Sequence, residues 1–175
     1  MFKLSTLSKL SGLVAVCGLA WATTITPASA RSSEVDQLRA AIVFNVLRFI
    51  EFAPEQRGTI DFCVAPDADG YDAFRSFSGR RAGSRIVSVR TARDGSYFGC
   101  DVVYLDSGGR DQIQRASARG RLVIGGGRRF IDNGGTVGLV QSGGQVRFQL
   151  NLVAASNSQL TISSRLIRLA SKVAR

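Results

Sequence analysis

Histidine is absent from this chain of 175 residues. Because histidine is the most frequent general base and a frequent zinc ligand, its absence excludes hydrolase triads and metal sites that depend on it. Cysteine is scarce too, and two cysteines beyond the N-terminal region cannot complete a four-ligand structural zinc site. We therefore expect no enzyme activity, no catalytic residue, no bound metal and no cofactor.

A pair of carboxylates is the remaining route to catalysis. Acidic residues are few, and their spacing does not favour two of them in one cleft. The interpretation we prefer is that they are solvated or capping side chains. The residues concerned are Glu51, Asp61, Asp101, Asp106 and Asp132.

Long hydrophobic runs are missing beyond the N-terminus, where residues 1–30 have the three parts of a secretory signal. Lys3 and Lys9 precede an apolar stretch, and a small-residue site ends at Ala30. The apolar stretch is shorter than the roughly 20 residues that span a bilayer. We predict export to the periplasm, cleavage after Ala30, and one domain over residues 31–175.

Negative charge is also scarce, and the formal net charge is +10. The two lysines of the signal account for two of these charges, which leaves +8 on the mature chain. In an exported protein such a balance favours an anionic surface or solubility over nucleic acid. Arg128 and Arg129 follow a Gly125–Gly127 turn that lacks the Lys-Ser/Thr ending of a phosphate loop, so they are only a weak candidate anion site.

Cys63 and Cys100 are the cysteines left after cleavage. In an oxidising compartment an even pair indicates a disulfide, and the alternative is two buried free thiols.

Hydrophobic periodicity predicts alternating helices and strands. Helices are expected over 34–52, 71–77 and 111–119, and strands over 59–65, 85–90, 102–105 and 122–124. Strands over 136–140 and 145–152 flank Ser142-Gly143-Gly144 as an antiparallel hairpin. An apolar stripe then predicts a closing helix, with Ile162, Leu166, Leu169, Ala170 and Val173 on one face.

The fold class that follows is α/β: a single domain with a mixed, mostly parallel sheet, flanking helices, a C-terminal antiparallel hairpin and a closing helix. The first helix is apolar around most of its circumference, which indicates burial by the sheet and by a second subunit in a homodimer.

Six segments together resemble the YfiR-type family of small periplasmic regulators. They are RAAIVFNVLRFIEFAP at 39–54, DFCVAPDADGYDAF at 61–74, GCDVVYLDSG at 99–108, RFIDNGGTVGLV at 129–140, VRFQLNLVAA at 146–155 and LTISSRLIRLASKV at 160–173. The chain departs from the family pattern at Gln149, where an acidic residue is usual, and at Asp101, where histidine is common. It also lacks the second cysteine pair of some members.

The resemblance implies a repressor that binds the periplasmic domain of an inner-membrane diguanylate cyclase and so lowers cyclic di-GMP. The partner-binding residues that it implies are Phe148, Gln149, Asn151, Leu152 and Ala155. Alternation along the strand leaves open that Phe148 and Leu152 are simply core. The alternative function is binding or sensing of a small anionic ligand in the periplasm.

Overall fold

The computed structural model describes residues 28–52, 58–93 and 95–175. The predicted signal up to residue 27 lies outside this range. The elements, in chain order, are α1 (Ala28–Leu47), β1 (Ile50–Glu51), β2 (Thr59–Val64), α2 (Tyr71–Arg75), β3 (Arg81–Ala82), β4 (Arg85–Thr91), β5 (Val102–Ser107), α3 (Arg110–Ala116), β6 (Leu122–Gly126), β7 (Val137–Ser142), β8 (Gln145–Asn151), α4 (Leu152–Asn157), β9 (Thr161–Ile162), α5 (Ser164–Leu169) and β10 (Lys172–Ala174). Within the described ranges, no helix is long and apolar enough to cross a membrane.

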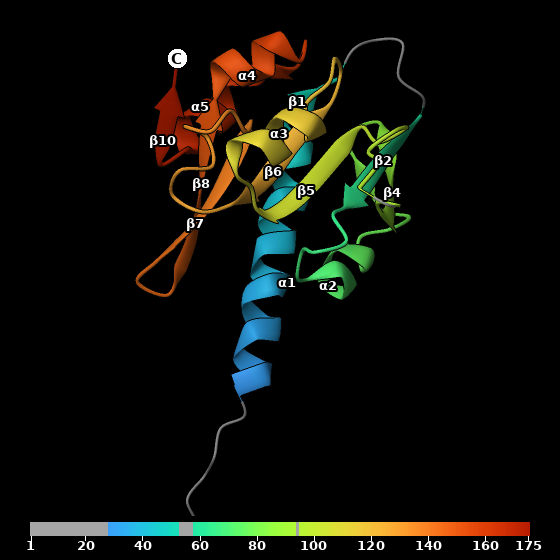
Figure 1. Ribbon diagram of the computed structural model, residues 1–175, viewed down its shortest axis with the longest axis vertical. Coiled ribbons are helices and arrows are strands. Elements are labelled where there is room, and N and C mark those ends of the chain that lie inside the picture. Colours follow the sequence, from blue (N-terminus) through green and yellow to red (C-terminus); the bar gives the residue numbers. More distant parts are fainter. Residues whose placement is uncertain (1–27, 53–57, 94) are drawn as a thin grey trace, which may run out of the picture.

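Eight strands form the main sheet in the order β10-β8-β7-β6-β5-β2-β4-β3 (Figure 1). The pairs β2–β4, β2–β5, β5–β6, β6–β7 and β8–β10 are parallel. The pairs β7–β8 and β3–β4 are antiparallel. The predicted α/β class with a mostly parallel sheet and a C-terminal hairpin is therefore confirmed.

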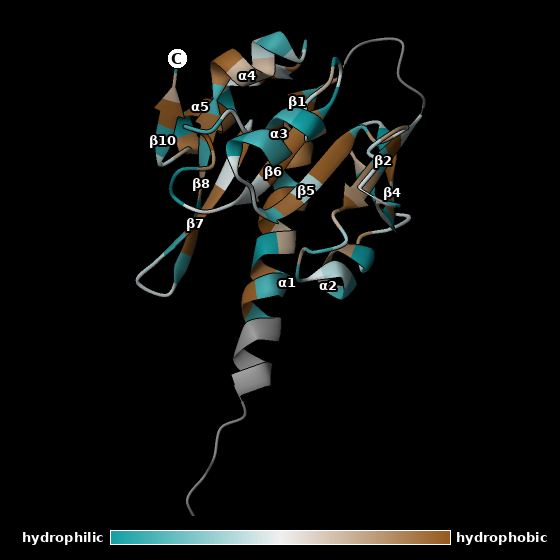
Figure 2. Cartoon of the chain, in the orientation of Figure 1, coloured by the Kyte–Doolittle hydropathy of each residue, from teal (hydrophilic) through white to brown (hydrophobic). Residues whose placement is uncertain are grey.

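Each face of the sheet has its own hydrophobic core. On one face Phe62, Tyr104 and Leu150 pack with α1 and α2, and Phe74 of α2 lies 4.3 Å from the Tyr104 ring. On the other face Val103 and Phe130 pack with α3, among other residues. Hydrophobic residues are concentrated in the central strands β5 and β6 (Figure 2), because strands covered on both faces carry apolar side chains on both.

Glycines allow the β7–β8 hairpin to turn and the chain to enter it. Gly143 and Gly144 have φ of 58° and 77°, the left-handed values that a two-residue hairpin turn requires. Gly134, before β7, has φ of 106°, whereas Gly135 has no positive φ. At Gly135 the reason for glycine is space, because an added Cβ atom would collide with the Phe130 ring.

The first helix ends earlier than predicted. It stops at Leu47, and Ile50 and Glu51 form a short strand that pairs with Ile162 and Thr161. The backbone N–H of Ser163 also donates to the carbonyl of Phe49. This pairing joins segments more than 100 residues apart in the chain, so the local apolar pattern does not reveal it.

The closing helix is present but shorter than predicted. Ile162 lies in β9 and Val173 in β10, so the helical part is α5 alone. After α5 the backbone N–H and the hydroxyl of Ser171 both donate to the carbonyl of Phe148, at 2.9 and 2.8 Å. The tail therefore adds a strand to the β8 edge, because the unpaired backbone groups of an edge strand favour pairing over a further helical turn.

Candidate partner-binding surface

Strand β8 divides the predicted contact residues between the two faces of the sheet. Phe148 pairs with Leu139 and is half-buried against the core that α1 covers. Gln149 pairs with Gly138 and points to the opposite face. The two side chains are adjacent in sequence, yet they do not share a surface.

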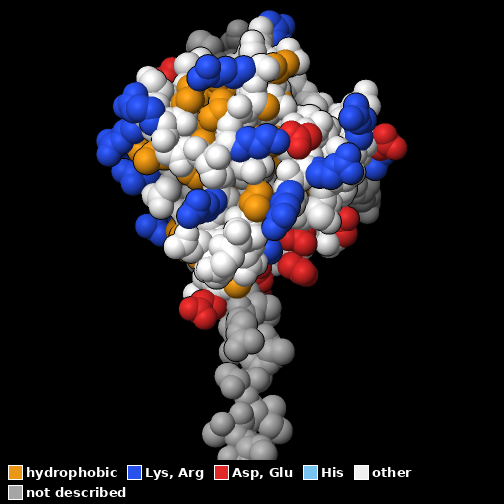
Figure 3. Space-filling model, turned by 90° about the vertical axis from the view of Figure 1, so that its left-hand side faces the viewer, with side chains coloured by type: hydrophobic (Ala, Val, Ile, Leu, Met, Phe, Trp, Pro, Cys, Tyr) orange, Lys and Arg blue, Asp and Glu red, His pale blue; other side chains and the backbone are white. Residues whose placement is uncertain are grey.

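A groove of about 430 Å³ lies between α1, β8 and α5. Most of its lining side chains are apolar, and one of them, Leu169, is 64% exposed. Figure 3 views the side of the molecule that carries the β7–β8 hairpin, α5 and β10, where hydrophobic side chains gather among lysines and arginines. The residues lining the groove are Ile42, Asn45, Val46, Phe49, Val146, Arg147, Phe148, Leu166, Leu169 and Ser171.

The groove is also basic. Among the described residues, its lining includes Arg147 and no carboxylate. The Arg165 guanidinium lies 5.6 Å from the centre of the Phe49 ring, which places a further positive charge beside the apolar surface. A surface of this kind suits a partner segment that is apolar in the middle and acidic around it.

Gln149 contributes an unpaired acceptor on the other face. Its side-chain oxygen is buried, and no donor reaches it from the part of the chain that the structure describes. A carboxylate in this place would be buried as a charge, which costs more than a buried neutral amide. The resemblance to the YfiR-type family implies an acidic residue here, and glutamine in its place removes a charge from a partly buried position.

Asn151 connects three parts of the fold. Its side-chain oxygen accepts from the backbone N–H of Ala154 at 2.9 Å and so caps α4. Its side-chain nitrogen donates to the carbonyl of Ile131 at 2.8 Å. Leu152 is half-buried and Ala155 is buried in the α1-side core. These positions give Asn151 and Ala155 roles within the fold, and their contact with a partner stays a prediction.

Replacing Asn151 with alanine is expected to lower the free energy of unfolding by about 2 kcal/mol. Loss of a helix cap typically costs about 1 kcal/mol, and loss of a hydrogen bond to a carbonyl costs about as much again. Urea denaturation measures the change. The control is Asn157→Ala, at the exposed C-terminal end of α4, which we expect to stay within about 0.5 kcal/mol. Equal effects of the two variants would contradict the capping role.

The cysteine prediction is confirmed. Cys63 and Cys100 form a disulfide that ties β2 to the segment preceding β5. Arg128 and Arg129 are exposed between β6 and β7, and neither forms an ion pair with a described carboxylate. The disulfide fits an oxidising compartment, and the anion site at the two arginines stays a prediction.

The acidic residues considered for catalysis mostly take part in ion pairs. Asp101 accepts from Arg85 at 3.1 Å, and Asp132 from Lys172 at 2.8 Å. Asp106 accepts from Arg39 at 3.4 Å. Burial raises the pKa of Asp101, while hydrogen bonding from the Asp61 backbone N–H and the charge of Arg85 oppose the rise. Three of the five carboxylates are therefore ion-paired, rather than solvated or capping as expected.

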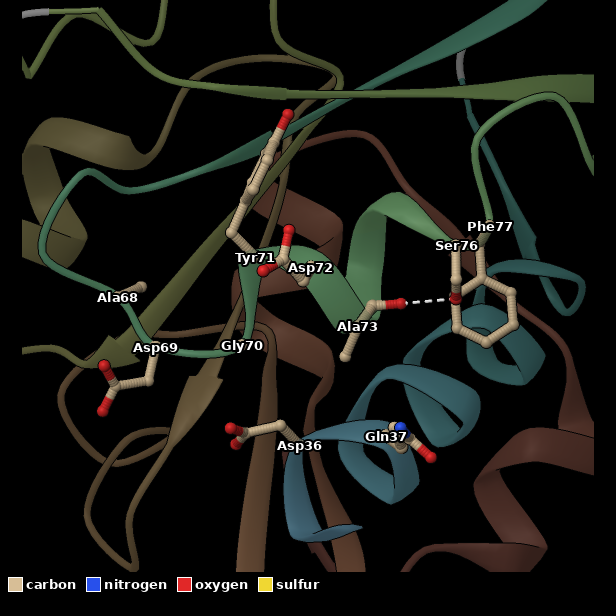
Figure 4. Close-up of a pocket in the computed structure, with 10 residues that line it drawn as sticks. All are labelled: Asp36, Gln37, Ala68, Asp69, Gly70, Tyr71, Asp72, Ala73, Ser76 and Phe77. Carbon is tan, nitrogen blue, oxygen red and sulfur yellow. Dashed lines mark hydrogen bonds between the residues drawn. The ribbon is translucent and has the colours of Figure 1, made fainter. Parts of the chain in front are cut away.

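A second hollow, of about 830 Å³, lies between the N-terminal half of α1 and the loop leading into α2 (Figure 4). Asp36, Asp69 and Asp72 are on its wall, together with Tyr71. Burial raises the pKa of Asp36, and the nearby Arg39 guanidinium opposes the rise at 3.5 Å. The described ranges contain no cluster of three or more Asp, Glu, Cys or His side chains arranged to hold a metal ion.

The family model described as YfiR/HmsC-like matches residues 36–171. The chain belongs to the YfiR/HmsC-like family. Membership confirms the resemblance and associates the chain with the regulation of diguanylate cyclases in the periplasm. No curated protein matches this YfiR/HmsC-like chain.

Two solved structures match this YfiR/HmsC-like chain. The first is described as an ABC domain in complex with L-Trp from Streptococcus pneumoniae, with 9% identity and a TM-score of 0.52. The second is a conserved domain protein from Vibrio cholerae O1 biovar El Tor, with 11% identity and a TM-score of 0.48. Each match covers 79% of this chain and 60% of the other. The likeness to the first concerns the fold alone.

The sequence interpretation missed most of the groove. Ile42 lies in α1 and Phe49 in the turn just after it, whereas Leu166 and Leu169 lie in α5, so the groove joins segments from both ends of the domain. The signal that could have revealed the groove was the wide apolar arc of the first helix. One sheet can bury only part of that arc, which leaves apolar side chains for another surface. Leu38, one turn before Ile42, is 43% exposed.

Proposed function

We propose that this YfiR/HmsC-like chain is an exported regulator that binds the periplasmic domain of an inner-membrane diguanylate cyclase and represses it. The observation that carries the proposal is the family match over residues 36–171. The function requires no catalysis, because a regulator acts through its difference in affinity for the two states of its partner. Binding to the inactive state shifts the cyclase toward that state and lowers cyclic di-GMP.

The groove between α1, β8 and α5 is the surface that we assign to the partner. An exposed apolar groove in a rigid scaffold supports docking, because apolar area removed from water drives association. The positive charges of Arg147 and Arg165 favour an acidic partner face. Phe148, a predicted partner-binding residue of the family-like segment 146–155, lines this groove.

Deleting the gene is expected to raise cyclic di-GMP, and restoring the wild-type gene to lower it again. A Leu169→Glu variant should leave the messenger as high as in the deletion strain, because it places a negative charge on the exposed apolar wall of a basic groove. The matched control is Phe98→Glu, at a side chain that is 91% exposed and does not line the groove. Cyclic di-GMP is measured in cell extracts, with immunoblots showing equal amounts of each variant.

Each outcome separates one part of the proposal. Unchanged cyclic di-GMP in the deletion strain would contradict repression itself. Full repression by the Leu169→Glu variant would support the function but contradict the groove as the partner-binding surface. A second copy of the chain in the groove would appear in light scattering as a dimer that the Leu169→Glu change dissociates.

A further inference from the structure

Several arginines in the middle of the chain have partners within the fold. Arg85 pairs with Asp101 at 3.1 Å, and Arg90 donates to the carbonyl of Phe98 at 3.1 Å. Arg121 donates to the carbonyls of Cys100 and Ala116, each at 3.0 Å. These three side chains are also partly buried against loops and strand ends, so they are less accessible to a ligand.

Three other arginines surround one pocket of about 400 Å³. Its lining consists of Phe44, Arg48, Phe49, Arg80, Arg81 and Gly83. The three arginine side chains are exposed, and none of them pairs with a carboxylate of the described residues. Arg81 donates one hydrogen bond, to the carbonyl of Ser84 at 3.3 Å, which leaves its other N–H groups for a ligand. Three unneutralised positive charges around one hollow raise the local potential and attract an anion.

The backbone around two of these arginines is fixed by hydrogen bonds. The backbone carbonyl of Arg80 accepts from the backbone N–H of Val87 at 2.9 Å, and the N–H of the neighbouring Gly79 donates to the carbonyl of Val87 at 2.8 Å. Arg81 pairs with Ile86 in the β3–β4 ladder. The next residue, Ala82, is buried and anchors the strand. A ligand would therefore meet two arginines whose backbone is fixed before it arrives.

An aromatic wall completes the pocket. The Arg80 guanidinium lies 4.7 Å from the Phe44 ring centre and 4.9 Å from that of Phe77. The two rings stack at 4.8 Å, so the guanidinium is held against a rigid surface. Arg48 comes from the other side, just after the last residue of α1. The positive groups thus converge from two separate elements.

We propose that this pocket binds a phosphate group, either free or as the headgroup of an anionic phospholipid. A phosphate offers more acceptor oxygens than a carboxylate, which suits three guanidinium groups, each able to donate two parallel hydrogen bonds. The site is separate from the predicted one at Arg128 and Arg129. It also does not depend on the proposed repression of a cyclase.

The test is a pair of binding measurements on the exported chain with its disulfide intact. Calorimetry with inorganic phosphate tests the free anion. Co-sedimentation with phosphatidylcholine vesicles, with and without phosphatidylglycerol, tests the headgroup. We expect the Arg48→Gln/Arg81→Gln variant to bind about tenfold or more weakly, because two charge-assisted contacts are lost. The matched control, Arg110→Gln/Arg115→Gln, removes the same charge from exposed positions on α3 and should stay within about twofold.

Binding of inorganic phosphate that only the pocket variant weakens would support the site with a free anion as its ligand. Binding only to phosphatidylglycerol vesicles, with the same dependence, would support it with a lipid headgroup. Equal weakening by both variants would mean that net charge alone attracts the anion and would overturn the site. Absence of binding in both measurements would overturn it as well.

Discussion

Removing the disulfide with Cys63→Ala/Cys100→Ala is expected to lower the free energy of unfolding by about 4 kcal/mol. The two cysteines are 37 residues apart, and a cross-link closing a loop of that length restricts the unfolded chain by about this amount in the chain-entropy model. Both cysteines are buried, with exposed fractions of 0% and 6%, so alanine avoids the cost of burying a serine hydroxyl. Small domains are stable by only about 5–15 kcal/mol, which makes this a large loss.

Denaturation in urea measures the effect, with and without reducing agent. Reduction should lower the stability of the wild type by a similar amount and should leave the alanine variant unchanged. A loss below about 1 kcal/mol would show that the unfolded chain is already restricted in this region, since residual structure reduces the benefit of a cross-link. The same measurement indicates how much folded regulator would survive in a reducing environment.

Local patterns predicted those parts of the fold that local interactions determine. Alternation over residues 59–65 identified β2, and the apolar run over 102–105 identified the central strand β5. The two glycines after Ser142 identified the hairpin, because few other residues adopt the required backbone. In each case the decisive signal lies within about ten residues of the element.

Long-range pairing overrode local preference where the prediction was wrong. The apolar pattern continues past Leu47, but pairing of β1 with β9 ends the helix there. Near the C-terminus, Gln159 has φ of 56°, a value that non-glycine residues seldom adopt, and it separates α4 from β9. A sequence containing Ser, Asn and Gln at this point gives little sign of that backbone.

The candidate site was predictable only in part for the same reason. The family motif pointed to Phe148, which does line the groove. A continuous motif of this kind can mark the wall that one strand supplies. The opposing wall comes from Phe49 and Leu169, which are far from β8 in sequence. The arginine pocket likewise joins Arg48 to Arg81 across two elements. Which distant segments become neighbours depends on the topology of the sheet, and local sequence patterns do not reveal that topology.

Replacing Gly135 with alanine is expected to destabilise the domain by about 3 kcal/mol. An added Cβ atom would lie 2.1 Å from a carbon of the Phe130 ring, far inside van der Waals contact. The Phe130 side chain is 2% exposed and is enclosed by the α3-side core, so it has little room to move. Overpacking of a filled core typically costs about 1–3 kcal/mol, and this contact belongs at the upper end.

A double-mutant comparison with Gly125 separates side-chain crowding from backbone crowding. A Cβ atom on Gly125 would meet the Phe130 ring at 2.2 Å and also the Leu105 carbonyl oxygen at 2.4 Å. Phe130→Ala alone should cost about 3–5 kcal/mol. Adding Gly135→Ala to it should cost almost nothing further, because the ring that the methyl group meets is gone. Adding Gly125→Ala should still cost about 1–3 kcal/mol, because the backbone contact remains. Urea unfolding of the wild type, the three single variants and the two double variants measures these couplings. Equal behaviour of the two glycines in the Phe130→Ala background would contradict the distinction.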